Sequence, residues 1–454
     1  MDGYNLESRT RRIVTMSGYT GLDTRDWIRT EGNMYDFDLI TDRRGHGSIK
    51  YDGLKAHFGK DDLIPLWIAD MDFRTPDFIV DALRERLSHP VFGYDFIPES
   101  YFPTISGWVK GLHGWDVPVE CFRYIPGIVK GIRLVIEEFL EKGDKVIIQT
   151  PVYHPFRIVP EASGHEVVYN PLIPVYSDGK GRMEDMQGKD RDRILTGYEM
   201  DFEQLESIMD DRTRLLILAN PHNPGGICWS PETLRRLAEI TSRHGVLVIS
   251  DEIHGEMALK GHKHHPFASV CQEAASNSIS FMAPSKTFNI AGVVSSYCII
   301  PDKGLRERFF GFLDSGELAS PNIFSVTATM AAYTKGHEWR EEMLEYVESN
   351  IDFVEKWLAE RIPGIRIFRP EASFLIWMDC RSLGMSQEEL VDLFVNKAGL
   401  ALNDGSMFSS KMKEGLQKPE GWLGNEGDGF MRLNVGCPRS ILETALQRLK
   451  DSMQ

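Results

Sequence analysis

The feature that most constrains the fold is a series of short, almost wholly apolar runs of residues. These runs cover residues 145–149, 214–219, 246–250 and 278–282, and helical patterns lie between them at 201–209 and 231–245. A strand with one face in water alternates apolar and polar residues, whereas a strand buried on both faces is apolar throughout. The alternation of such strands with helices predicts an α/β fold with a mostly parallel sheet that helices cover on both faces.

Further elements are predicted on either side of these runs. Thr75, Pro76 and Asp77 combine an N-cap residue, a first-turn proline and a first-turn acid, which predicts a helix that extends to about Ser88. Other predicted elements are a helix at 127–141, a strand at 165–169, helices at 321–360 and 386–398, and strand-like pieces at 365–368, 374–378 and 430–435. Because the character of the chain changes after Ser320, its last part is interpreted as a second, α+β domain.

Charge and composition disfavour several classes of partner. The chain of 454 residues has 51 basic and 67 acidic side chains, so its net charge is 51 − 67 = −16, which disfavours nucleic acid and anionic membranes as partners. No apolar stretch is long enough to span a bilayer, and the arginines near the start precede no apolar signal core. The six cysteines are widely and irregularly spaced, which favours reduced thiols and a cytoplasmic protein over disulfides or a zinc site.

Three further segments are interpreted as an extension, a surface insertion and a polar turn. Residues 1–34 are polar without a clear period and are treated as an N-terminal extension, and residues 179–196, rich in Gly, Asp, Lys and Arg, are predicted to be a surface insertion. The short tract of His262, His264 and His265 lies on a polar turn. Such tracts are more often solvated than metal-binding, so no metal site is predicted.

Polar residues follow three consecutive predicted strands, at the edge where open α/β sheets bind ligands. Asn223 comes after the run at 214–219, Asp251 directly ends the run at 246–250, and Lys286 follows the run at 278–282. A lysine that forms a Schiff base with a pyridine cofactor is usually paired with an acidic or basic residue at the ring nitrogen. Lys286 together with Asp251 therefore suggests pyridoxal 5′-phosphate.

Other residues fit such a site, although each has a simpler interpretation. The glycine-containing segment around Val129 and Lys130 leads into a helix, whose free N–H groups suit a phosphate, but plain glycine loops are common. Tyr153 could stack on a ring or belong to the core, and His254 could bond the cofactor or be structural. Arg432 has the planar geometry that clamps an α-carboxylate, but a strand arginine is more often an ion-pair or surface residue.

Taken together in order and spacing, these pieces resemble the fold-type I pyridoxal-phosphate enzymes of the class I/II aminotransferase-like superfamily. Within it, the chain is similar to the branch of cystathionine β-lyases and cysteine–sulfur lyases often called MalY/PatB. The segments that carry the resemblance are 35–38, 42–50, 66–73, 91–94, 223–226, 250–254, 285–292 and 431–439. The resemblance extends from about Met34 to the end of the chain.

The resemblance implies a role for each candidate residue. Lys286 would carry the cofactor and later move the Cα proton. The cofactor contacts would come from Asp251 at the ring nitrogen, Asn223 and His254 at the phenolic oxygen, Tyr153 on the ring, and Val129, Lys130 and Ser285 at the phosphate. Tyr94 would reach the phosphate of the second subunit of a homodimer. Arg432 would hold the substrate carboxylate, and Ala69 and Asp70 would line the entrance.

The resemblance also implies the architecture, and it has one departure. The expected fold has a mostly parallel seven-stranded sheet in a large domain at 75–320. A smaller α+β domain would be built from an N-terminal part at 35–74 and a C-terminal part at 321–454. Many relatives have Arg or Lys eight residues after the Schiff-base lysine, where this chain has Val294. The phosphate charge must then be met by Lys130 or by backbone groups.

The implied activity is β-elimination on a sulfur-containing amino acid, such as cystathionine, cystine or an S-substituted cysteine, giving a thiol, pyruvate and ammonia. The leading alternative is transamination between an amino acid and a keto acid on the same scaffold. A third hypothesis is a regulatory protein that uses the fold as a ligand sensor. The residues alone do not decide between elimination and transamination, and the preference for elimination comes from the resemblance.

Overall fold

The computed structural model describes residues 34–177, 179–180, 193–410 and 426–453. The compact unit that contains every element named below spans Phe37–Gln454. Most of the predicted N-terminal extension, and residues 181–192 of the predicted insertion, lie outside the described residues. Within the described part of the chain, no helix combines the length and apolarity that crossing a bilayer requires.

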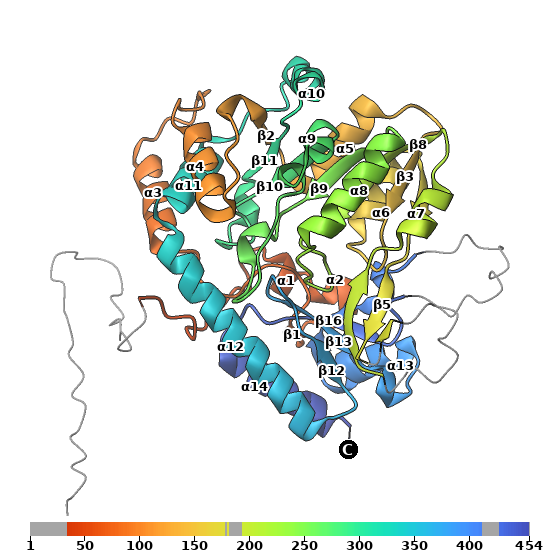
Figure 1. Cartoon of the computed structure of the whole chain (residues 1–454). Coiled ribbons are helices and arrows are strands. Elements are labelled where there is room, and N and C mark those ends of the chain that lie inside the picture. The colour runs from red at the N-terminus through yellow and green to blue at the C-terminus, as the bar shows by residue number, and fades with distance from the viewer. Residues whose placement is uncertain (1–33, 178, 181–192, 411–425, 454) are drawn as a thin grey trace, which may run out of the picture. The chain divides into compact units, whose positions relative to one another are not determined.

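A seven-stranded sheet forms the centre of the unit (Figure 1). Its strand order is β2 (Phe122–Ile125), β11 (Ser296–Ile299), β10 (Ser278–Met282), β9 (Leu247–Asp251), β8 (Thr213–Ala219), β3 (Lys145–Ile148) and β4 (Glu166–Tyr169). Neighbours pair in parallel except for β11, which runs antiparallel to both β10 and β2. The predicted mostly parallel seven-stranded sheet is confirmed.

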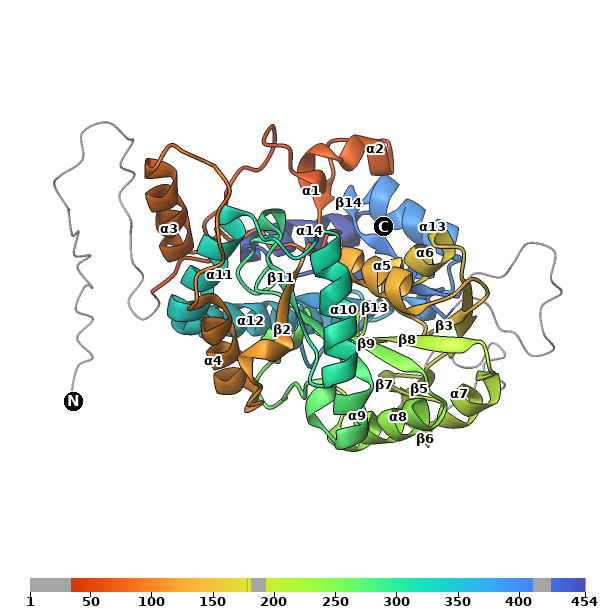
Figure 2. The same ribbon diagram turned by 90° about the horizontal axis from the view of Figure 1, so that it is seen from above.

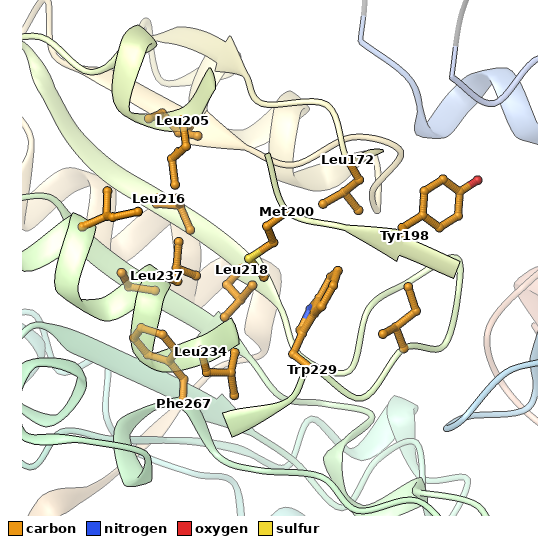
Figure 3. Packing of buried hydrophobic residues seen from close by; sticks show 14 of the residues in the cluster. Leu172, Tyr198, Met200, Leu205, Leu216, Leu218, Trp229, Leu234, Leu237 and Phe267 are labelled. Carbon is orange, nitrogen blue, oxygen red and sulfur yellow. The ribbon is translucent and has the colours of Figure 1, made fainter. Parts of the chain in front are cut away.

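The central strands are mostly apolar because both of their faces are buried. On β8, Leu216 and Leu218 belong to one core, which Figure 3 shows with Leu234 and Leu237 of the helix α8 (Pro231–Arg243). The alternate residues of β8 belong to a second core on the other face, which contains side chains from α5 (Ile128–Phe139), α6 (Pro155–Ala162) and α10 (Lys303–Ser315). Alternating side chains therefore fill two separate cores, as the pleat of a strand requires.

Further helices belong to the same compact unit. Their bounds are α3 (Asp77–Ser88), α4 (Tyr101–His113), α7 (Phe202–Ile208), α9 (Gln272–Ser276), α11 (Ile323–Lys335) and α12 (His337–Arg361). The start predicted for α3 is wrong in detail: Pro76 stands at the N-cap without a side-chain cap. The Thr75 hydroxyl instead donates to the Asn289 carbonyl, 3.2 Å away, because a tertiary partner is within reach.

A second, four-stranded antiparallel sheet lies in the C-terminal part. Its order is β12 (Arg366–Phe368), β13 (Leu375–Asp379), β16 (Phe430–Asn434) and β15 (Asn403–Asp404). Segments distant in sequence meet beside it, since β1 (Ile64–Pro65) pairs in parallel with β14 (Leu400–Ala401). Figure 2 shows α1 (Ile49–Asp52) and α2 (Leu54–Phe58) close to β14 and α13 (Gln387–Val391), and α14 (Arg439–Asp451) packs on α12. The predicted domain boundaries remain a prediction.

One predicted loop contains regular structure. A three-stranded sheet in the order β6 (Gly179–Lys180), β5 (Ile173–Tyr176) and β7 (Leu195–Glu199) includes the two ends of the predicted insertion. In β7 the side chains of Leu195 and Tyr198 are buried in the core that contains Trp229. The predicted insertion extends too far toward the C-terminus, because Leu195 and the residues after it form β7, which pairs with β5.

Candidate active site

A cavity of about 320 Å³ opens at the carboxyl ends of β8, β9 and β10. Nine of the predicted site residues line it, namely Ala69, Val129, Lys130, Tyr153, Asn223, Asp251, His254, Ser285 and Lys286. The strands that carry Asn223, Asp251 and Lys286 are adjacent and parallel, so their ends meet at one edge of the sheet. This edge is where ligands bind in open α/β sheets.

Lys286 lies in the loop after β10, with its amine in partly buried surroundings. Its Nζ donates a hydrogen bond to the carbonyl of Ala69. Burial lowers the pKa of this amine to about 8, against the opposing attraction of Asp70 and Asp251. A lysine with a pKa near neutrality is partly unprotonated and can act as a nucleophile or a base.

Asp251 is the last residue of β9 and only 8% exposed. Its carboxylate accepts one backbone bond, from the Ile253 N–H at 3.1 Å. Burial raises the pKa of Asp251 to about 7, although the charge of Lys286 favours the ionised form. Since no ion pair to Asp251 forms within the described residues, a cationic ligand atom would relieve this cost of burial.

His254 and Asn223 lie beside the same cavity. Burial lowers the pKa of His254 to about 3, so the ring is neutral, and its Nδ1 has no hydrogen-bond partner in the described part of the structure. The Asn223 side chain accepts a bond from Arg432 at 3.0 Å, and its carbonyl accepts the Tyr153 N–H at 3.1 Å. A buried nitrogen without a partner is rare in proteins and points to a ligand contact.

The start of α5 forms another wall of the cavity. Gly127 is the N-cap with φ of 114°, a conformation that glycine adopts at low cost, and it lets Ile128, Val129 and Lys130 begin the helix. Val294 lines the same cavity with an aliphatic side chain, in agreement with the departure noted from sequence. Among the described lining residues, Lys130 is the cation on the α5 wall, where helix N–H groups already favour an anion.

Arg432, on β16, is a buried cation that has no acidic partner among the described residues. The residue is 4% exposed, and its guanidinium donates to Asn223 Oδ1 at 3.0 Å, Asn403 Oδ1 at 2.6 Å and the Trp67 carbonyl at 3.1 Å. It also lies 4.9 Å from the Phe408 ring centroid, while its Nε has no partner among the described residues. Burial lowers its pKa to about 10, so it stays charged at neutral pH. An anionic ligand group would neutralise this charge and accept its remaining hydrogen bond.

Three predicted site residues do not line the central cavity, namely Arg432, Tyr94 and Asp70, although Arg432 donates a hydrogen bond to Asn223, which does line it. Tyr94 is fully exposed on the described chain. The carboxylate of Asp70 pairs with Arg43 at 2.7 Å and with Lys50 at 3.7 Å, and it lines a separate cavity of about 370 Å³. The predicted roles of Tyr94 in a second subunit and of Asp70 at the entrance stay predictions.

One histidine of the short tract at 262–265 is buried, although the sequence predicts a solvated turn. His264 is 2% exposed, and its Nε2 lies 2.8 Å from the carboxylate of the buried Glu252. His262 stays on the surface, 3.6 Å from Glu371. The prediction that all three histidines are solvated is therefore wrong for His264, because Glu252, directly after Asp251, supplies a buried partner.

Sequence reasoning also missed residues that shape the site. Asn403 bonds Arg432, Lys50 is a fully buried lysine, and Asn289 and Asn434 bond backbone groups of the segment at 68–73. The available signal was their position: Asn289 comes three residues after Lys286, and Asn434 two residues after Arg432. Their partners are distant in sequence, so the contacts could not be derived from the spacing.

Comparisons with known proteins agree with this site. The profile of the aminotransferase class I and II family matches residues 123–449. Cystathionine beta-lyase PatB of Bacillus subtilis (strain 168) is 39% identical over 92% of this chain and 100% of its own. A PLP-bound protein of Clostridium difficile 630, assigned as an aminotransferase, is 38% identical with a TM-score of 0.82, covering 92% of this chain and 100% of its own. The PLP-bound C-S lyase of Staphylococcus hominis is 30% identical with a TM-score of 0.77, covering 92% and 98%.

Proposed function

This chain belongs to the aminotransferase class I and II family, and we propose that it is a pyridoxal-phosphate-dependent carbon–sulfur β-lyase. It converts a cysteine S-conjugate such as cystathionine, with water, to a thiol, pyruvate and ammonia. The observation that carries this choice is the 39% identity to a cystathionine beta-lyase along that relative's whole length. The geometry of the cavity serves elimination and transamination equally, so the preference rests on that likeness.

Pyridoxal phosphate fits the residues of the cavity. Asp251 is a buried carboxylate that lacks an ionic partner within the described residues, which suits the protonated ring nitrogen. The unpartnered Nδ1 of His254 suits a polar group of the cofactor. Lys286 has the lowered pKa that attack on an aldehyde requires. When bound, the cofactor supplies an electron sink for the charge that develops at the substrate Cα.

The chain's own residues would then divide the work on the substrate. Arg432 binds the α-carboxylate, since the carboxylate satisfies a buried cation that has only neutral partners among the described residues. This contact fixes the Cα proton relative to Lys286, whose released amine removes it. Loss of the β-thiolate follows, and the remaining three-carbon fragment hydrolyses to pyruvate and ammonia.

The phosphate end of the site depends on the start of α5. The first-turn N–H groups near Val129, the Ser285 hydroxyl and the Lys130 amine supply donors and positive charge. Lys130 takes the place of the cation that Val294 does not provide. We include in the proposal a homodimer in which Tyr94 of one copy reaches the phosphate of the other, a role that its full exposure on the single chain allows.

The proposal is tested by replacing the lysine. Lys286→Ala should abolish release of thiol from cystathionine and should remove the visible absorbance of the bound cofactor, because the other lysine of the described lining, Lys130, belongs to the proposed phosphate end. Lys110→Ala, which removes an exposed lysine of α4 outside this lining, is the control and should keep both the absorbance and the thiol release. A Lys286→Ala protein with wild-type absorbance and thiol release would contradict the assignment.

A further inference from the structure

One backbone segment touches both functional cations of the site. We call residues 67–73 the bridging segment. Its Trp67 carbonyl accepts a bond from Arg432 at 3.1 Å, and its Ala69 carbonyl accepts a bond from the Lys286 amine. Two carbonyls of one short segment thus set the positions of the proposed carboxylate clamp and the proposed base.

Asn434 fixes the bridging segment from the side of the small sheet. It is fully buried at the end of β16, two residues beyond Arg432. Its amide donates to the carbonyls of Ile68 and Asp70, each at 2.7 Å, and its oxygen accepts the Gly436 N–H at 2.8 Å. These two carbonyls flank Ala69, so the amide holds the peptide whose oxygen contacts Lys286.

Asn289 fixes the same segment from the side of the large sheet. It follows Lys286 by three residues and has φ of 55°, a left-handed conformation that asparagine tolerates better than most residues. Its oxygen accepts the Met71 N–H at 3.1 Å, and its amide donates to the carbonyls of Met71 and Phe73 at 2.8 Å each. The loop that carries Lys286 is thereby tied to the segment that receives the lysine's amine.

Buried charges anchor the segment a third time. Lys50 is fully buried and donates to the Asp70 carbonyl at 3.0 Å and to the Asp72 carboxylate at 2.8 Å. The Asp72 N–H donates to the Gly436 carbonyl at 2.7 Å. Satisfied buried networks of this kind restrain the backbone strongly, because any movement leaves charged or polar groups without partners.

We propose that Asn289 and Asn434 are positioning residues for the proton transfer by Lys286. They hold the Ala69 carbonyl where it receives one N–H of the amine after the amine is released from the cofactor. With one N–H directed at that carbonyl, the lone pair is restricted in direction, and the amine meets the Cα proton in a defined geometry. The inference rests on the proposed cofactor and on the base role of Lys286, but not on the elimination step.

The test uses a substrate without a leaving group. Each cofactor-loaded protein is incubated with saturating L-alanine in heavy water, and exchange of the Cα proton is followed by NMR. The variants are Asn289→Gly, which suits the left-handed backbone and removes the amide, and Asn434→Leu, which keeps size and loses the donors. Asn170→Leu is the matched control, because Asn170 is equally buried and also donates to a main-chain carbonyl, that of Asp201.

We expect both variants to slow exchange by about tenfold or more, because a small displacement of a catalytic group has effects of that size. The cofactor absorbance should be kept, and its pH titration should shift in the two variants but not in Asn170→Leu. Exchange within twofold of wild type in both variants, or an equal loss in Asn170→Leu, would overturn the inference.

Two further readouts keep the result interpretable. Unfolding temperatures of the cofactor-free proteins show whether a variant is merely unstable, and if Asn434→Leu does not fold, the partly exposed Asn289→Gly carries the test alone. Wild-type exchange without pyruvate release from cystathionine would contradict the proposed lyase activity and leave the positioning role standing. Normal pyruvate release by the wild type, with unimpaired exchange in the variants, would contradict the positioning role and leave the proposed lyase activity standing.

Discussion

At the residue scale, burial moves the two central ionisable groups of the site toward neutrality. The pKa of Asp251 rises to about 7 and that of Lys286 falls to about 8. Neither shift helps the cofactor-free protein, since each reflects the cost of holding a charge away from water. Both suit the proposed chemistry, in which the carboxylate receives a cationic ring nitrogen and the lysine serves as nucleophile and base.

Asp251→Asn should therefore stabilise the cofactor-free protein while weakening its hold on the cofactor. The folded protein keeps a proton on Asp251 between pH 3.8 and about 7 that the unfolded chain has lost, so stability falls as pH rises through this range. Asn does not titrate, so the variant keeps this stability, and above pH 7 its free energy of unfolding should exceed that of the wild type by up to about 4 kcal/mol. Thermal unfolding of the two cofactor-free proteins between pH 5 and 8 checks this, and parallel pH slopes would contradict it.

Arg432→Lys should raise the KM for cystathionine by roughly 10- to 100-fold with a smaller change in kcat. A lysine is a point charge without the planar fork that binds a carboxylate at two points, so one or two charge-assisted bonds are lost. Steady-state kinetics measures the effect. An S-substituted cysteamine, which lacks the carboxylate, is the control ligand: its inhibition constant should be nearly the same in both proteins, and a tenfold change in it would point to a general disturbance of the site.

The residues of the site were predictable to the extent that they follow strands. Asn223, Asp251 and Lys286 were identifiable because the carboxyl ends of adjacent parallel strands meet at one edge. The sequence did not identify Asn289, Asn434 or the buried pair of His264 with Glu252. Their contacts arise from packing between separate segments of the chain.

At the element scale, the start of α5 depends on a close approach between the helix and the sheet. A Cβ added to Gly131 would lie 2.8 Å from a side-chain carbon of Ile125 and 3.1 Å from Phe281. The glycine lets the helix lie against β2 and β10, with its first turn at the cavity. The helix position, and with it the proposed phosphate site, thus follows from one small residue.

Gly131→Ala should destabilise the protein by about 1–3 kcal/mol, as overpacking of a core does, and should lower cofactor affinity. The matched control is Gly107→Ala in α4, where an added Cβ meets nothing within 4 Å. That change should stabilise by about 0.5–1 kcal/mol through helix propensity alone. Chemical denaturation of both variants measures the effects. Equal effects of the two substitutions would show that packing at Gly131 is unimportant.

The elements most accurately predicted are the buried parallel strands and the amphipathic helices between them. Their apolar patterns show which faces of each strand and helix are buried. The antiparallel strands β2 and β11, and the small sheet of β5, β6 and β7, were missed, because these strands are short. In β2, β5 and β7 buried and partly exposed residues are mixed, and β11, although wholly buried, begins with Ser, Tyr and Cys and so lacks a continuous aliphatic run. The predicted insertion extends into β7 for the same reason, because that strand was not recognised from its sequence.

At the scale of the whole molecule, the proposed homodimer makes each site depend on two chains. The segment around Tyr94 exposes several large apolar side chains, including Val91, Phe92 and Phe96. Contiguous exposed apolar surface of this kind marks an interaction site. A second copy of the chain is the partner that would bring Tyr94 to the start of α5.

Mixing two inactive variants should restore activity if the sites are shared. Tyr94→Ala and Lys286→Ala each spoil both sites of their own dimers, but a mixed dimer has one site with both residues intact. Random re-association of equal amounts should return about a quarter of the wild-type activity, as two-fold symmetry requires. Activity is measured after denaturation and joint refolding, with separately refolded variants as the control. No recovery in proven mixed dimers would contradict a shared site.

The account as a whole depends on the fate of the substrate after Lys286 moves the Cα proton. The most direct measurement is incubation of the purified, cofactor-loaded protein with cystathionine in the complete absence of keto acid, with thiol, pyruvate and ammonia quantified together. We predict sustained turnover in which the three products appear in equal amounts. Turnover that begins only when a keto acid is added, with an amino acid formed in place of ammonia, would show transamination and contradict the proposed lyase activity.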